Sequence, residues 1–134
     1  MSAERVLLVG LRASSVDFSK WPEISREVLE RAAVEVGEGL RKAGFAVRYC
    51  LTDDGATAHD ELAQTLDDFR PDIVSIGAGV RVDPDHLRLF EDMVNLVHER
   101  APGATLAFNT DPMDTIRSVR RAAERRARSG VDPL

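Results

Sequence analysis

The sequence predicts an α/β fold in which helices cover both faces of one parallel sheet. Four short apolar runs rich in β-branched residues alternate with longer segments whose apolar residues recur at helical spacing. One of these runs, residues 73–76, is apolar at almost every position, which is typical of a strand buried on both faces of such a sheet. The 134 residues, 43% of them hydrophobic, suffice for a full core. We therefore expect a single three-layer α/β domain over residues 1–134.

The first strand is expected at residues 5–11. The connection after it, residues 12–20, is longer than most strand-to-helix connections, so it is either functional or mobile. The first helix is indicated by apolar residues at helical spacing over residues 24–40. Gly37 and Gly39 weaken its last turns relative to alanine, and we expect close packing on the sheet to offset this cost.

The second strand is expected at residues 46–51, after Gly44, which is suited to end the first helix. Thr57 with Asp60 three residues later resembles a capping box, so we expect Thr57 to cap the second helix. The Arg-Pro pair at residues 70–71 should end that helix, because the residue before a proline avoids helical geometry.

The third strand, residues 73–76, should lie in the centre of the sheet. Gly77 and Gly79 follow it and allow a sharp turn, for which we expect a positive φ at Gly79. The Asp-Pro pair at residues 83–84 is typical of an N-cap with proline at the first helical position. A third helix is therefore expected over residues 84–100.

The fourth strand is expected at residues 105–108, and residues 109–112 open the last helix with another polar cap before a proline. From about residue 126 we expect this helix to lose its core contacts and fray, because an arginine-rich segment is followed by Ser-Gly and Asp-Pro pairs. Alternating strands and helices with right-handed crossovers favour the flavodoxin-like strand order 2-1-3-4. A Rossmann-like half is the alternative.

Composition excludes several classes of protein. No apolar run approaches the length of a membrane span, and the N-terminus leads into a strand rather than a signal peptide, so we expect a cytoplasmic protein with no membrane partner. The single cysteine, Cys50, excludes an internal disulfide and is expected to be a buried thiol. The net charge of −5 argues against nucleic-acid binding.

The motifs of common cofactor-binding α/β proteins are incomplete. The segment GAGVRV has Val82 where a dinucleotide fingerprint needs its third glycine, and it follows the third strand rather than the first. The sequence has no Walker A motif, and glycine stands where a receiver domain needs its phosphoacceptor aspartate. The three histidines are widely spaced along the chain. We therefore expect no cofactor and no metal.

A ligand site is predicted where the first, third and fourth strands end, because ligands of open α/β sheets bind at the carboxyl ends of strands next to a topological switch point. Arg12 and Arg81 would hold an anion there, and the glycines would leave it space. His86 or Asp17 would carry a proton if the protein is an enzyme. The predicted ligand-binding residues are Gly10, Arg12, Gly77, Gly79, Arg81, Asn109 and Thr110.

The segments GAGVRVDPDHLRLFE and NLVHERAPGATLAFNTDPMDT resemble a group of short, uncharacterised bacterial α/β proteins that carry GxGVR and AFNTxP motifs. The resemblance covers the second half of the chain best and implies no activity. It does imply that the GAGVR and FNTDP segments act together.

Two functions are compatible with the sequence. The first is a cytoplasmic domain that binds a small anionic metabolite, either without catalysis or as a cofactor-independent enzyme. The second is a non-catalytic interaction or regulatory module that forms a homodimer through the helix at residues 84–100. The dimer is expected because the apolar residues of this helix cover about half of its circumference, more than one sheet contact needs.

Overall fold

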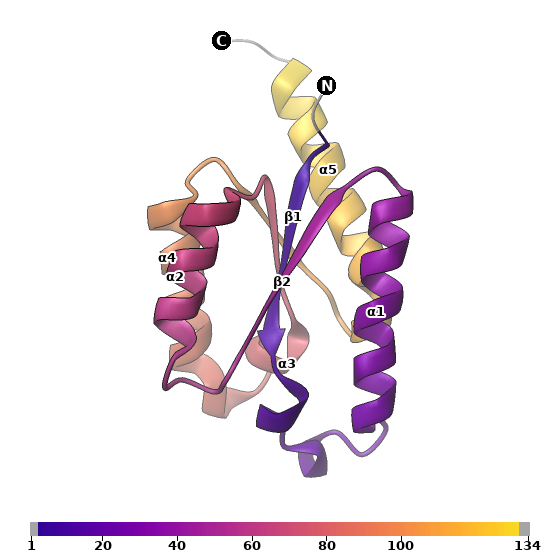
Figure 1. Ribbon diagram of the computed structural model, residues 1–134, viewed down its shortest axis with the longest axis vertical. Coiled ribbons are helices and arrows are strands. Elements are labelled where there is room, and N and C mark those ends of the chain that lie inside the picture. Colours follow the sequence, from indigo (N-terminus) through magenta and orange to yellow (C-terminus); the bar gives the residue numbers. More distant parts are fainter. Residues whose placement is uncertain (1–2, 132–134) are drawn as a thin grey trace.

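The computed structural model describes residues 3–131, which form a four-stranded sheet flanked by helices (Figure 1). All strands are parallel and lie in the order β2-β1-β3-β4. Their bounds are β1 (Arg5–Leu11), β2 (Ala46–Thr52), β3 (Ile73–Ile76) and β4 (Thr105–Phe108). The flavodoxin-like order is confirmed. The strands β1, β3 and β4 have the predicted bounds, and β2 is one residue longer.

The helices form one layer on each face of the sheet. On one face lie α1 (Arg26–Lys42) and α5 (Thr115–Val131), and on the other lie α2 (Ala58–Phe69) and α4 (Leu87–Arg100) (Figure 1). A one-turn helix, α3 (Ala78–Arg81), follows β3 directly. Short 3-10 turns occupy the connections: η1 (Ala13–Ser15), η2 (Phe18–Lys20), η3 (Pro84–His86) and η4 (Pro112–Asp114).

Successive strand residues pack into two different apolar cores. Leu7 belongs to the core under α2 and α4, where it packs with residues such as Leu62. Val6 belongs to the opposite core, together with Leu40 of α1 and Val119 of α5. All four residues of β3 are buried, which confirms its predicted central position.

The two glycines near the end of α1 are explained by close contacts. A Cβ atom at Gly37 would lie 2.0 Å from the hydroxyl oxygen of Tyr49, which donates a hydrogen bond to the Ala33 carbonyl. A Cβ atom at Gly39 would lie 2.6 Å from Cδ1 of Ile116 in α5. The predicted close packing on the sheet is therefore found at Gly37, whereas Gly39 packs against a neighbouring helix.

Gly44 ends α1 as predicted. Its φ of +99° lies in the left-handed region, where a side chain would be strained. The Gly44 N–H donates to the Arg41 carbonyl at 3.0 Å, and the Phe45 N–H donates to the Leu40 carbonyl at 3.1 Å. This pair of bonds is a Schellman motif, which satisfies carbonyls left open at the helix end.

Two local predictions are wrong. The Thr57 side chain makes no capping bond to α2 and instead contacts Asp53 and Glu61. Gly79 does not have a positive φ, because the chain continues into α3 rather than turning sharply. The helix predicted over residues 84–100 is found, with its first turn as the 3-10 turn η3 and the rest as α4. Asp83 caps η3 through the Asp85 N–H, as expected of an Asp-Pro pair.

Most of the apolar surface of α4 is covered within the chain. Met93, Leu96 and Val97 are buried, and Leu89, Phe90 and Val94 are partly buried against the same core. Because α4 packs on α2 as well as on the sheet, it needs a wider apolar arc than one sheet contact requires. Leu87 remains 56% exposed. The homodimer stays a prediction.

The last helix continues to Val131, beyond the point where fraying is predicted. Arg126 is held there by a contact of 3.1 Å to Glu4 and a hydrogen bond of 2.8 Å to the Gly103 carbonyl. The end of the predicted tail, residues 132–134, lies outside the described residues. Within residues 3–131, none of the helices has the length and apolar character that crossing a bilayer requires.

Candidate functional site

A cleft of about 550 Å³ lies at the carboxyl ends of β1 and β3, on the face of the sheet that α1 covers. Its base is formed by strand residues and one wall by the first half of α1. The other wall is the long connection between β1 and α1, and the segment after β4 closes the remaining side. Most lining residues are apolar, among them Leu8, Val16, Ile24, Leu29, Val36 and Leu51.

The base of the cleft is open because two strand ends carry glycine. A Cβ atom at Gly10 would lie 3.8 Å from Cδ2 of Leu51, and one at Gly77 would lie 3.6 Å from the Val9 carbonyl oxygen. These are ordinary contact distances, so the glycines leave free volume rather than avoid a clash. Ser75 also lines the cleft and is 2% exposed. Its hydroxyl makes no hydrogen bond to another residue of the described chain.

The connection between β1 and α1 supplies aromatic side chains to the cleft. Phe18 and Trp21 both line it. Between them, Lys20 points away and contacts Asp83 at 3.0 Å and Asp85 at 2.6 Å, so it fixes the connection to the turn before α4. Hydrogen bonds to Asp85 and Asp83 raise the pKa of Lys20. The predicted long loop thus forms a wall of the cleft.

Asn109 joins the three segments that meet beside the cleft. Its Oδ1 accepts a hydrogen bond of 2.9 Å from the Ala78 N–H, and its Nδ2 donates to Oγ1 of Thr115 at 2.8 Å. Asn109 is 6% exposed, so both bonds are shielded from water. The GAGVR and FNTDP segments are therefore in direct contact through this side chain.

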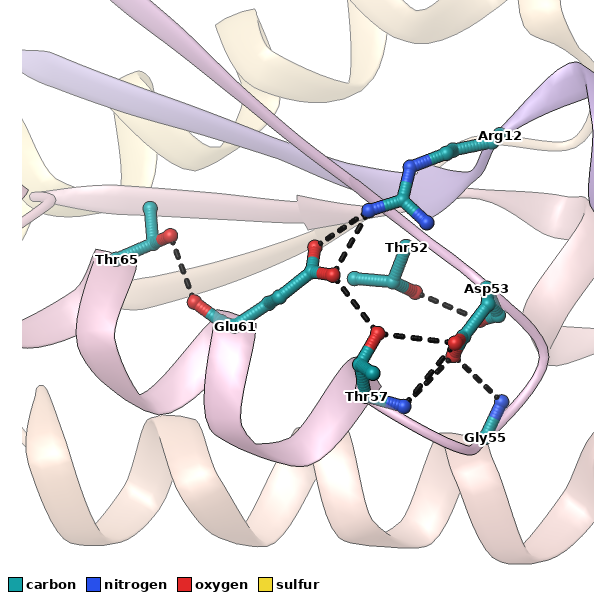
Figure 2. Close-up of polar contacts among 7 residues, drawn as sticks. All are labelled: Arg12, Thr52, Asp53, Gly55, Thr57, Glu61 and Thr65. Atoms are coloured by element: carbon teal, nitrogen blue, oxygen red, sulfur yellow. Dashed lines mark hydrogen bonds and ion pairs between the residues drawn. The ribbon is translucent and has the colours of Figure 1, made fainter.

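Arg12 does not line the cleft, and its guanidinium lies against Glu61 of α2 (Figure 2). Its Nη2 donates to both carboxylate oxygens of Glu61, at 2.8 and 2.9 Å. Thr57 contacts the same carboxylate and also Asp53, which in turn accepts the Gly55 N–H. Hydrogen bonds from Thr57 and Arg12 lower the pKa of Glu61. The guanidinium thus has a resident anionic partner.

Arg81 also has partners within the chain. Its guanidinium lies over the Phe108 ring, with the central carbon 5.3 Å from the ring centroid. Its Nη2 donates to the Asn109 backbone carbonyl, whereas its Nε is buried without a hydrogen-bond partner. Arg81 therefore fixes the backbone directly after β4.

Neither of the two predicted proton carriers lines the cleft. Nδ1 of His86 is 3.6 Å from Oδ2 of Asp83 and 3.4 Å from the Gly79 carbonyl oxygen. Asp17 accepts hydrogen bonds from the backbone and hydroxyl of Ser19, which lower the pKa of Asp17. Both side chains therefore have local structural contacts.

Of the predicted ligand-binding residues, Gly10, Gly77, Gly79, Asn109 and Thr110 line the cleft. Arg12, Arg81, His86 and Asp17 do not belong to its lining as the structure describes it. Among residues 3–131, no group of three or more His, Cys, Asp or Glu side chains is arranged to hold a metal ion. The one cysteine, Cys50, is buried as predicted, and burial raises the pKa of its thiol.

Four of the residues that line the cleft were not predicted from the sequence, namely Phe18, Trp21, Tyr49 and Ser75. Phe18 and Trp21 stand in a loop, where no periodicity marks them. Tyr49 and Ser75 stand in strands, where they look like ordinary core positions. The loop residues could have been identified, because two aromatic residues in a long polar connection indicate that the connection packs against the rest of the fold rather than being mobile.

The comparisons with known proteins leave the family of this chain open. No model of a known protein family matches it, and no curated protein matches it in sequence.

Proposed function

We propose that the protein is a small-molecule-binding domain and that the cleft at the carboxyl ends of β1 and β3 is its binding site. The observation that carries the proposal is the cleft itself, about 550 Å³ of mostly apolar space with a few polar groups at its base. Ligand sites of proteins commonly have this size and composition. We expect the binding to take place in the cytoplasm, as the composition predicts.

The position of the cleft also supports the proposal. In the order β2-β1-β3-β4 the chain leaves β1 toward one edge of the sheet and leaves β3 toward the other, so the topological switch point lies between these strands. Gly10, near the end of β1, and Gly77, directly after β3, line the cleft. Because neither His86 nor Asp17 lines the cleft, we propose binding rather than catalysis.

Filling the cleft from its base tests this function. In Gly10→Val, the added side chain would occupy free volume next to Leu51, where a Cβ atom meets no clash. Gly103→Val is a matched control, because a Cβ atom there has no heavy atom within 4 Å and Gly103 lies at the other end of the sheet. A library of small metabolites would be screened by thermal shift against the parent and both variants.

We expect hits that stabilise the parent and Gly103→Val, with affinity for Gly10→Val weaker by about tenfold or more, which corresponds to about 1.4 kcal/mol. Trp21 gives a second measurement, since it is the one tryptophan of the sequence and lines the cleft. Compounds that stabilise all three proteins equally, without changing Trp21 fluorescence, would place binding outside the cleft. A dimer mass in light scattering that Leu87→Glu abolishes would favour the interaction module instead.

A further inference from the structure

We infer that the cleft takes an uncharged molecule with a mostly apolar body and one hydrogen-bonding group, rather than an anion. This inference rests on the proposed function and names the class of its ligand. It is argued from three properties of the lining: its aromatic and aliphatic walls, the charges at its rim, and the neutral polar groups at its base.

The walls offer apolar contact from both sides. Phe18 and Trp21 stand on the connection before α1, and Leu29 and Val36 stand on α1 itself. Tyr49 lines the cleft with its hydroxyl already bonded to the Ala33 carbonyl, so the part of it left for a ligand is the ring. A ligand body that matches these walls is apolar, because burying an unpaired polar group against them would cost free energy.

The charges at the rim disfavour an anion. Among the described residues, the lining has no lysine and no arginine, but it has the exposed carboxylates of Glu23, Glu30 and Asp111. The two arginines expected to hold an anion are occupied elsewhere, Arg12 by Glu61 and Arg81 by Phe108 and the Asn109 carbonyl. An anion would thus enter past carboxylates, of which Glu30 is paired with Arg26, and would meet no side-chain cation among the described lining residues.

The same carboxylates do not make a site for a cation. Glu30 accepts a hydrogen bond of 2.8 Å from Nε of Arg26, and Asp111 accepts the Met113 N–H at 2.7 Å. Both therefore have partners at the surface. A cation that reached the base of the cleft would lose its hydration without gaining a buried carboxylate, which is unfavourable.

The base of the cleft provides a neutral hydrogen-bonding group. Ser75 lies on the lining, and its hydroxyl makes no hydrogen bond to the other described residues. The oxygen is not among the fully buried polar atoms without a partner, so it keeps some access to the cleft. The neighbouring pair of Asn109 and Thr115 is already joined at 2.8 Å. A hydroxyl, carbonyl or amide on the ligand would satisfy Ser75.

Three probes with one apolar body and different charges test the inference: naphthylmethanol, naphthoate and naphthylmethylammonium. Each would be titrated by calorimetry into the full chain, into Gly10→Val and into Ser75→Ala. We expect the affinity for the alcohol to be higher than that for either ion by a factor of about ten or more, because neither ion finds a buried partner. Ser75→Ala should weaken the binding of the alcohol about threefold to tenfold. Methylnaphthalene, which lacks the hydroxyl, serves as a control probe, and its affinity should be the same for the parent and Ser75→Ala.

Each outcome separates the inference from the proposed function. If the naphthoate or the ammonium binds most tightly and Gly10→Val weakens it, the cleft is a binding site but its ligand is not uncharged. If no probe binds the parent, or if all bind Gly10→Val equally well, both the site and the inference are wrong. If the alcohol binds best and Ser75→Ala has no effect, the apolar class stands and the role of Ser75 is overturned.

Discussion

The two ends of the sheet carry depressions of nearly equal size and opposite chemistry. The cleft at the carboxyl end measures about 550 Å³ and that at the amino end about 560 Å³. The first is mostly apolar and, over the described residues, has no lysine or arginine in its lining. The second is bordered by four arginines, namely Arg5, Arg70, Arg100 and Arg126. Size alone would therefore not distinguish them.

Most arginines at the amino end already have anionic or carbonyl partners. Arg126 contacts Glu4 at 3.1 Å and Asp72 at 3.5 Å, and Arg5 donates to the Arg70 carbonyl at 2.7 Å. Arg100 contacts Asp67 at 2.7 Å. The contacts of Arg126 and Arg5 join α5, the start of β1 and the loop before β3, and the contact of Arg100 joins α4 to α2. The charges at this end connect segments of the chain.

The two ends differ in which groups and surfaces remain available to a ligand. At the amino end, guanidinium groups face carboxylates and carbonyls, and exposed pairs of this kind contribute little free energy each. At the carboxyl end, apolar walls enclose space, and the Ser75 hydroxyl on the lining makes no hydrogen bond to the other described residues. A ligand gains more from the second arrangement, because apolar contact and a shielded hydrogen bond are both available. Asn109 and Arg126 allow the two ends to be compared by mutation.

Asn109→Ala should produce the largest loss of stability. It would leave the Ala78 N–H and the Thr115 hydroxyl without their buried partner, which we expect to lower the free energy of unfolding by about 1–3 kcal/mol. Urea denaturation measures the change. Asn95→Ala is the matched control, because Asn95 is exposed on α4 and should change stability little. Equal losses in the two variants would show that Asn109 does not hold the carboxyl end together.

The fold was predictable because its signals are local. Each strand of this sheet is a short apolar run, and Gly44 and the Asp-Pro pair at 83–84 mark helix boundaries through backbone geometry that few other residues adopt. The failures at Thr57 and Gly79 are also local. The Thr57 hydroxyl bonds to Asp53 and Glu61 instead of capping α2. Gly79 lies in the helical turn α3, because glycine allows a positive φ but does not require one.

The site was predictable only in its position. The switch point places it, and the glycines at the ends of β1 and β3 mark its base. The side chains of Arg12 and Arg81 could not be placed, because their partners, Glu61 and Phe108, are distant in sequence. A long arginine side chain can reach several carboxylates or aromatic rings that lie near it in the fold. A single sequence contains no pattern that predicts which of these it contacts.

Arg126→Met should produce a smaller loss than Asn109→Ala, and one that depends on salt. Removing the guanidinium breaks its contacts with Glu4 and Asp72, and we expect the free energy of unfolding to fall by about 1 kcal/mol at low salt. The loss should shrink in high salt, which screens the pairs in the parent. Arg125→Met, at an exposed neighbouring position, is the control. A salt-independent loss would mean that Arg126 acts through packing of its stem.

The smallest expected effect concerns the ion pairs of Lys20, which tie the aromatic wall of the cleft to the turn before α4. Hydrogen bonds from Lys20 and from the Asp85 N–H hold the pKa of Asp83 below its ordinary value. A carboxylate with a lowered folded-state pKa stabilises the fold above its unfolded pKa, and this contribution is lost as the pH falls through the folded pKa. The contact should therefore be intact at neutral pH and weaken below about pH 4.

Trp21 lies next to Lys20 and reports this change through its fluorescence. In the parent we expect the emission to be constant near neutral pH and to shift to longer wavelength below about pH 4. The shift is expected because the connection that carries Trp21 moves away from the turn before α4, which exposes the indole to water. Lys20→Met should show part of that shift already at neutral pH, because Asp83 and Asp85 lose their cation. Lys42→Met replaces the other lysine of the chain, exposed at the end of α1, and should behave as the parent. If Lys20→Met and the parent emit identically at neutral pH, the wall keeps its place through Phe18 and Trp21 alone, and apolar packing rather than charge holds the carboxyl end closed.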